Sequence, residues 1–186
     1  MQGTLKNFDL PSDIYSDDVR DIMGECLKRN GEREWKAVVL TNEIHGHLGI
    51  YSTLGAKMGL RAREWFEAQG IEGHIHVLSF AGSTPPVSCL NDGLQVSTGA
   101  SLGHGLIAVS DEPATRPEAI FSCGERSIRL ALKPEYAAQI RTDISDALSR
   151  FGSTPLYWQR VRDLALNYWC LWHRREIFSE VQNIKC

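Results

Sequence analysis

Two histidines separated by one glycine, His45 and His47, are the residues of this chain best suited to chemistry. Further along the chain, Cys89 and Asp92 form a Cys-x-x-Asp element. Imidazole, thiolate and carboxylate are the usual ligands of zinc and related divalent metals. The sequence therefore predicts a site in which His45, His47 and Cys89 bind a divalent metal, zinc being the best match. The alternative is that the histidines cap the following helix and hydrogen-bond to backbone.

Asp92 and Tyr51 are candidate catalytic residues near these ligands. Asp92 could be a metal ligand, could orient a histidine through a hydrogen bond or could act as a general base, and it could also cap the next helix. Tyr51 lies one turn beyond His47 and could present its phenol as a proton donor, although its place in an apolar stripe favours packing. His74 and His76 share one face of a predicted strand, and we keep them as reserve ligands.

Two segments carry a resemblance to a known family. The segment HGHLGIYSTLGAKMGLRA, which begins at His45, resembles the signature FHGHLCPGLAIGYRA of the FmdE family, named after the E subunit of formylmethanofuran dehydrogenase. The segment SCLNDGLQVSTGASLGHGLIAV, which begins at Ser88, resembles the second signature of that family, DCxxDAIQxxTGCTLGKGNL. The resemblance implies an α+β fold similar to the catalytic domain of glyceraldehyde-3-phosphate dehydrogenase, a bound metal such as zinc, and frequent dimerisation.

Position by position, the resemblance assigns roles to residues of this chain. His45 and His47 match the HGH histidines, and Cys89 and Asp92 match the Cys-x-x-Asp element. The helix and turn after that element add the binding candidates Gln95, Thr98 and Gly99.

The chain departs from the family pattern at several ligand positions. Gly49 and Ala100 stand where the signatures have cysteine, Ile50 and Tyr51 replace a Pro-Gly pair, and His104 replaces a lysine. The loss of two thiolates changes any metal site, and three ligands plus water would resemble an open catalytic zinc site. His104 lies in a glycine-rich turn, where it could supply a lost donor and join the binding candidates, or could simply be exposed.

Composition limits the possible partners and compartment. The formal net charge is -3 with interspersed charges, so we expect no nucleic-acid partner. No window reaches the ~18 apolar residues of a membrane span, and the first ten residues lack a basic start followed by an apolar stretch. The five cysteines are irregularly spaced, which favours reduced thiols. We expect a cytoplasmic protein that acts on an unknown small-molecule ligand, with no membrane partner.

Hydrophobic periodicity predicts the elements. We expect helices over residues 17–30, 48–69, 134–151 and 154–181, with a short helical stretch ending at Thr98. We expect strands over residues 35–41, 74–80, 106–110, 119–122 and 127–132. Gly55 and Gly59 lie inside the second helix, where each costs about 1 kcal/mol relative to alanine, so they indicate a close contact with another backbone.

These elements predict an α+β fold with a mostly antiparallel sheet, helices packed on one face, and a long aromatic C-terminal helix. We expect an FmdE-like domain over residues 1–152 and a helical extension over residues 153–186. The extension is rich in tryptophan, tyrosine and arginine, which are enriched at protein interfaces, so we expect a homodimer through this helix. A lid that stacks on a flat ligand and a membrane-surface helix are the alternatives.

Two functions fit these observations. In the first, the chain is a metal-dependent enzyme or small-molecule-binding protein, with Asp92 as the base beside a metal held by His45, His47 and Cys89. In the second, it is a non-catalytic metal-carrying or docking subunit of a larger redox complex. The first requires a pocket at the metal, whereas the second is compatible with a closed site.

Overall fold

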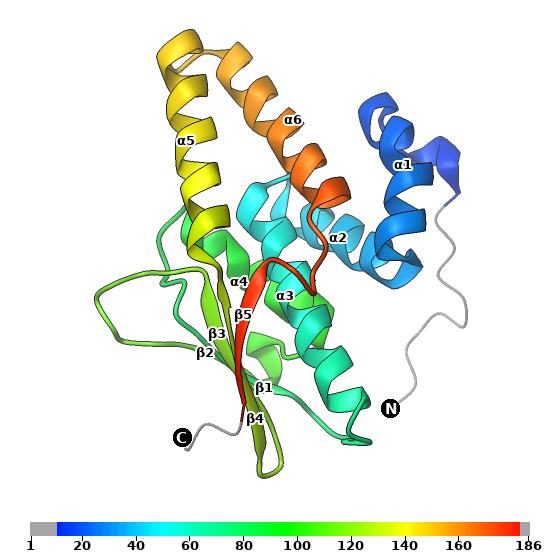
Figure 1. The fold of residues 1–186 in the computed structure, drawn as a ribbon, viewed down its shortest axis with the longest axis vertical. Helices are drawn as coiled ribbons and strands as arrows, with labels where there is room; N and C mark the ends of the chain where they lie inside the picture. Colours follow the sequence, from blue (N-terminus) through cyan, green and yellow to red (C-terminus); the bar gives the residue numbers. More distant parts are fainter. Residues whose placement is uncertain (1–10, 183–186) are drawn as a thin grey trace.

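A computed structural model describes residues 11–182, which form six α-helices and one five-stranded sheet (Figure 1). The α-helices are α1 (Asp17–Asn30), α2 (Glu32–His45), α3 (Ile50–Glu67), α4 (Leu90–Thr98), α5 (Pro134–Phe151) and α6 (Pro155–Leu171). The strands are β1 (His76–Ser79), β2 (Ile107–Val109), β3 (Glu118–Cys123), β4 (Arg126–Leu132) and β5 (Phe178–Gln182). Three short 3-10 helices are η1 (Ser12–Ile14), η2 (Val87–Cys89) and η3 (Leu102–His104).

The sheet has the strand order β2-β1-β3-β4-β5, in which only β1 and β2 are parallel. Val77, Phe121 and Ile128 lie side by side across three strands and are at most 3% exposed. Their neighbours alternate to the other face, where Leu78 is 38% exposed. One face of the sheet is therefore buried under helices, which confirms the predicted α+β class with a mostly antiparallel sheet.

Helices α3 and α4 cross at glycines, as Gly55 and Gly59 indicated. A Cβ atom added to Gly55 would collide with the carbonyl oxygen of Leu90, and one added to Gly59 would collide with the side chain of Ser97. On the facing helix, a Cβ atom at Gly93 would collide with the backbone of Ser52 and Ala56. The two backbones can therefore approach closely only because these positions are glycines without side chains. This close approach brings the start of α4 next to α3.

The predicted strand over residues 35–41 is wrong, because these residues lie within α2. The run is rich in valine, which favours a strand, but its buried residues follow a helical period, with Trp35 at 2% and Val38 at 0% exposure, followed by Thr41 at 0%. Burial of this face against other helices outweighs the weak intrinsic preference of valine for strands.

The predicted helix over residues 154–181 is too long. Helix α6 ends at Leu171, and the chain returns as β5, which pairs antiparallel with β4. The buried ammonium of Lys57 donates hydrogen bonds to the carbonyl oxygens of Trp169 and Trp172, both at 2.8 Å. These bonds satisfy carbonyl groups at the end of α6, while β4 offers an unpaired edge to the residues that follow.

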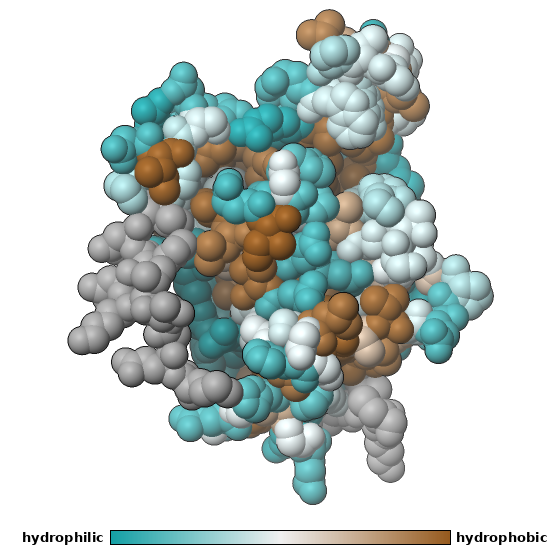
Figure 2. Space-filling view, turned by 180° about the vertical axis from the view of Figure 1, so that it is seen from behind, coloured by the Kyte–Doolittle hydropathy of each residue, from teal (hydrophilic) through white to brown (hydrophobic). Residues whose placement is uncertain are grey.

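Two of the four large aromatic residues of α6, Tyr168 and Trp169, are buried within the chain itself. Trp169 is 1% exposed and stacks on Trp35, whereas Trp158 is 64% exposed. Homodimerisation and the domain boundary at residue 152 stay predictions, although β5 joins the same sheet as the preceding strands. Within residues 11–182, no helix combines the length and apolar character needed to cross a membrane. On the face shown in Figure 2, hydrophobic residues form separate patches divided by hydrophilic ones.

Candidate functional site

The turn between α2 and α3 holds the two histidines. Gly46 adopts a left-handed conformation with φ of 86° and ends α2, and its N–H donates to the carbonyl oxygen of Asn42. The Asn42 side-chain oxygen accepts hydrogen bonds from the Gly49 N–H at 3.0 Å and from the Ser52 hydroxyl at 2.7 Å. One buried amide therefore ties the end of α2 to the start of α3 and fixes the backbone on both sides of His47.

His45 is oriented by Asp92 from the start of α4. Its Nδ1 atom lies 2.7 Å from a carboxylate oxygen of Asp92, and the His45 side chain is 11% exposed. Because an ionised carboxylate only accepts hydrogen bonds, Nδ1 carries a proton in this contact, and Nε2 is the ring nitrogen left to face another group. Nε2 is buried and has no hydrogen-bond partner among the described residues. A ring whose Nδ1 is held by a carboxylate and whose Nε2 is left without a partner is the arrangement of many metal-binding histidines.

His47 lies against His45. The centroids of the two imidazole rings are 4.4 Å apart. Partial burial lowers the pKa of His47, and the neighbouring His45 lowers it further. His47 is therefore neutral at pH 7, which is the form that binds metals.

A pocket of about 520 Å³ opens beside the histidines and contains two more of the predicted site residues, Cys89 and Tyr51. Burial raises the pKa of the Cys89 thiol, and the Asp92 carboxylate raises it further. Burial also raises the pKa of Tyr51, against the opposing effect of Arg141. Both groups therefore keep their protons at neutral pH, and the Tyr51 phenol is able to donate a hydrogen bond.

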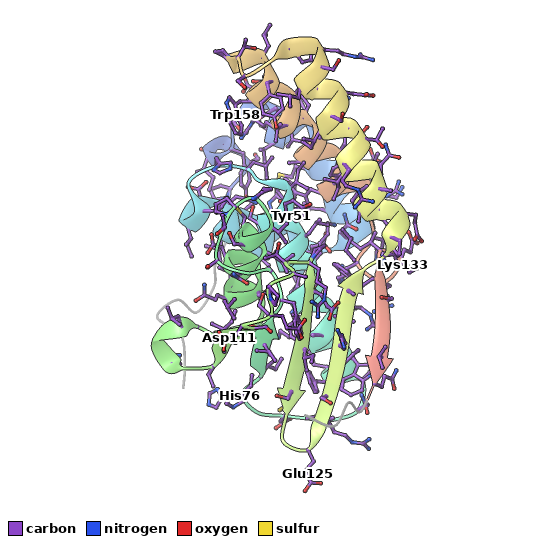
Figure 3. The ribbon with its side chains drawn as sticks, turned by 90° about the vertical axis from the view of Figure 1, so that its left-hand side faces the viewer. Tyr51, His76, Asp111, Glu125, Lys133 and Trp158 are labelled. Atoms are coloured by element: carbon purple, nitrogen blue, oxygen red, sulfur yellow. The ribbon has the colours of Figure 1, made fainter. Side chains whose placement is uncertain are left out.

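The pocket walls come from four stretches of the chain, residues 45–51, 85–89, 140–144 and 157–161. The lining residues are His45, His47, Gly49, Ile50, Tyr51, Pro85, Pro86, Cys89, Ile140, Arg141, Ile144, Tyr157, Trp158 and Val161. Figure 3 looks onto this side of the molecule, with Trp158 of α6 above Tyr51 of α3. A volume of this size is typical of pockets that hold small molecules.

Of the three predicted metal ligands, His45 and His47 lie close together, whereas the complete set with Cys89 is not yet grouped around one point. His45 and His47 lie together and share the pocket with Cys89. In the described part of the chain, however, no three histidine, cysteine, aspartate or glutamate side chains are already grouped closely enough to hold an ion. A Cβ atom added to Gly49 would lie 3.3 Å from His45 Nε2, so the position where the family signature has cysteine borders the unpartnered nitrogen.

The binding candidates of α4 and its following turn lie outside this pocket. The Gln95 side-chain oxygen accepts a hydrogen bond from the Leu102 N–H at 3.0 Å. The Thr98 hydroxyl donates to the carbonyl oxygen of Leu94 at 2.6 Å and accepts from the Ala100 N–H at 3.0 Å. Gly99 is left-handed, with φ of 78°, and ends α4. These three residues shape the turn after α4.

The other histidines considered as ligands also lie away from the pocket. His74, His76 and His104 are exposed, and none of them is among the lining residues. Sequence reasoning did not select Arg141 of α5 as a site residue, and no local motif marks it. Tyr157 and Trp158 entered the sequence analysis only as part of the aromatic C-terminal segment, and both line the pocket.

A second cavity of about 440 Å³ lies on the other side of His47, between α1, α2 and α6. Its arginine, Arg162, is already paired with Asp18 at 2.6 Å. Neither Cys89 nor Tyr51 lines this cavity. The pocket shared by both histidines, the thiol and the phenol is therefore the better candidate site.

Comparisons with known proteins match both the sequence motifs and the fold. The family model described as "FmdE, Molybdenum formylmethanofuran dehydrogenase operon" matches residues 44–154. The fold resembles the crystal structure of a protein from Syntrophus aciditrophicus that is itself described as similar to FmdE of tungsten formylmethanofuran dehydrogenase. The TM-score is 0.52, with 16% identity over 82% of this chain and 73% of that chain. No curated protein matches the sequence.

Proposed function

Because this chain belongs to the FmdE family, we propose that it is a zinc-binding protein that holds a small molecule in the pocket beside His45, His47 and Cys89. One observation carries the proposal. His45 Nε2 is buried without a hydrogen-bond partner among the described residues, on a ring that lines the pocket and is held by Asp92. An unpaired buried polar atom is costly, and a bound ion at this nitrogen would remove that cost.

The roles of the side chains follow from their contacts. His45 and His47 would hold the ion, and Cys89 is the third candidate ligand in the same pocket. When bound, a divalent ion supplies a Lewis acid that polarises an oxygen of the ligand or activates water. Asp92 is not among the lining residues and bonds to His45, so we assign it the positioning of that ring in place of the general-base role. Tyr51 keeps its proton and would donate a hydrogen bond to the ligand.

The pocket favours an enzyme or small-molecule-binding protein over a non-catalytic docking protein. A metal with a purely structural or carrier role needs no cavity beside it, whereas catalysis requires an open coordination position and room for a substrate. The pocket walls are mostly isoleucine, valine, proline and aromatic side chains, which would keep water away from a bound ligand.

The proposal is tested by measuring zinc content after the purified protein has been incubated with zinc and dialysed. We expect about one zinc per chain in the wild type and a large loss in the His45→Ala/His47→Ala double variant. Cys89→Ser should weaken retention as well. His104→Ala is the matched control, because this histidine is exposed and lies outside the pocket. Equal zinc content in the wild type and the double variant would remove the proposal.

A further inference from the structure

The pocket contains one permanently charged side chain, that of Arg141 on α5. No aspartate or glutamate lines the pocket. Arg141 is an exposed residue at the rim, and among residues 11–182 its guanidinium forms no hydrogen bond or ion pair. The arginine of the neighbouring cavity, Arg162, is by contrast neutralised by Asp18. The pocket beside the histidines therefore offers an unmatched positive charge to whatever enters it.

The other walls of the pocket suit a flat, apolar body. Tyr157 and Trp158 form an edge-to-face pair with ring centroids 5.0 Å apart, and the Trp158 residue is 64% exposed. Tyr51 lines the same pocket from α3. Figure 3 labels Tyr51 and, above it, Trp158. Ile140, Ile144 and Val161 complete an aliphatic wall. Aromatic rings pack favourably against rings and aliphatic side chains of this kind.

We propose that this pocket binds an aromatic carboxylate, with its carboxylate on Arg141 and its ring against Trp158 and the aliphatic wall. A guanidinium matches a carboxylate with two parallel hydrogen bonds, which a lysine or a histidine does not offer. The proposal rests on the small-molecule pocket of the proposed function but does not require the metal. The proposal thereby specifies the chemical class of the small molecule that the pocket binds.

The charge is tested with two probes of the same shape, 2-naphthoate and its neutral amide, 2-naphthamide, in calorimetric titrations. Because Arg141 is exposed, the wild type should bind 2-naphthoate roughly threefold more tightly than the amide. Arg141→Gln should remove this preference, whereas Arg150→Gln should retain it, because Arg150 is likewise an exposed arginine of the same helix but does not line the pocket. Equal binding of both probes to the wild type, or a preference that survives in Arg141→Gln, would overturn the proposal.

The ring contact is tested with a second matched pair. Trp158→Ala should weaken both probes by about fivefold without changing the ratio between them. Leu156→Ala should leave both affinities unchanged, because Leu156 is similarly exposed at 63% on the same helix but lies outside the lining residues. Equal effects of the two substitutions would contradict the predicted position of the ring.

Titrations of zinc-loaded and chelator-treated protein separate this proposal from the metal site. An anion preference that depends on Arg141 in both samples supports the ligand class even if the zinc measurements fail. Zinc binding without any anion preference overturns the ligand class alone. Binding of neither probe in either sample also overturns it.

Discussion

At the scale of single residues, the site depends on two separate sets of hydrogen bonds, one around Asn42 and one between His45 and Asp92. Asn42 holds the segment around His47, and Asp92 fixes the ring of His45 so that Nε2 faces away from the carboxylate. Gly49 lies between these groups, and its replacement by a side chain would place carbon 3.3 Å from that nitrogen. A single position therefore controls whether a further ligand can reach the proposed ion.

Gly49→Cys should strengthen zinc binding, because it places a thiolate beside His45 Nε2 where the family signature has cysteine. We expect roughly tenfold tighter binding in a competition titration with a chromophoric chelator. Gly49→Ala is the control, since it adds the same Cβ atom without adding sulfur, and in both variants the Ser52 hydroxyl, which would lie 2.7 Å from that atom, has to move aside. The backbone at this position is extended, with φ of -112°, and accepts both residues. Identical affinities of the two variants would place the ion elsewhere.

At the scale of elements, the crossing of α3 and α4 delivers Asp92 to His45. The crossing is close because Gly55 and Gly93 leave no side chain between the two backbones. Asp92 is the residue directly before Gly93, so a change in the separation of the helices also changes the contact between Asp92 and His45. The orientation of His45 as a candidate metal ligand therefore depends on how closely α3 and α4 pack.

Gly55→Ala should destabilise the fold by roughly 2–4 kcal/mol, because the added methyl group would collide with the backbone of Leu90. Gly24→Ala is the control, since a Cβ atom there meets nothing within 4 Å on an exposed part of α1. It should stabilise the protein by about 0.5–1 kcal/mol through higher helix propensity. Urea denaturation gives both free energies of unfolding, and equal values for the two variants would show that the crossing is looser than described.

At the scale of the whole molecule, a buried ion pair joins helices that are far apart in the sequence. Lys57 of α3 lies 2.5 Å from Glu34 of α2, both side chains are 0% exposed, and Lys57 also bonds to the end of α6. Arg174 reaches the second oxygen of Glu34 at 3.1 Å. The turn that leads from α6 into β5 is thereby held against the helical core.

Lys57→Met should lower the free energy of unfolding by about 3 kcal/mol, because Glu34 loses its closest buried partner while keeping Arg174. Lys36→Met removes a more exposed pair with Glu32, whose side chain is 68% exposed, and should change the stability by less than about 0.5 kcal/mol. Thermal and urea unfolding of both variants measure the difference. A similar small effect in both would mean that the buried pair contributes little.

Homodimerisation also belongs to this scale. The exposed apolar residues of α6 include Leu156 and Trp158, at 63% and 64% exposure. Sedimentation equilibrium should give twice the mass of 20.8 kDa if the predicted dimer forms. A monomer at all concentrations would contradict that prediction.

The sequence alone determined most elements, because helices and strands are encoded by local periods. The strands around Val77, Phe121 and Ile128, helix α5 and the close contact at Gly55 were all predictable from residues within one turn or strand of each other. The HGH motif likewise marked the two histidines that lie together. The hydrophobic periods and the HGH motif are each contained in a short stretch of the chain.

Only the tertiary structure decided which distant residues meet. Burial against other helices made Trp35 and Val38 helical despite the valines, and the edge of β4 drew the C-terminal residues into β5. Arg141 and Trp158 join His47 at one pocket although about a hundred residues separate them from it in the sequence, and no local pattern records that contact. Packing of nonlocal apolar surface sets such contacts, because the free energy of burial depends on which faces are available and not on their order in the chain.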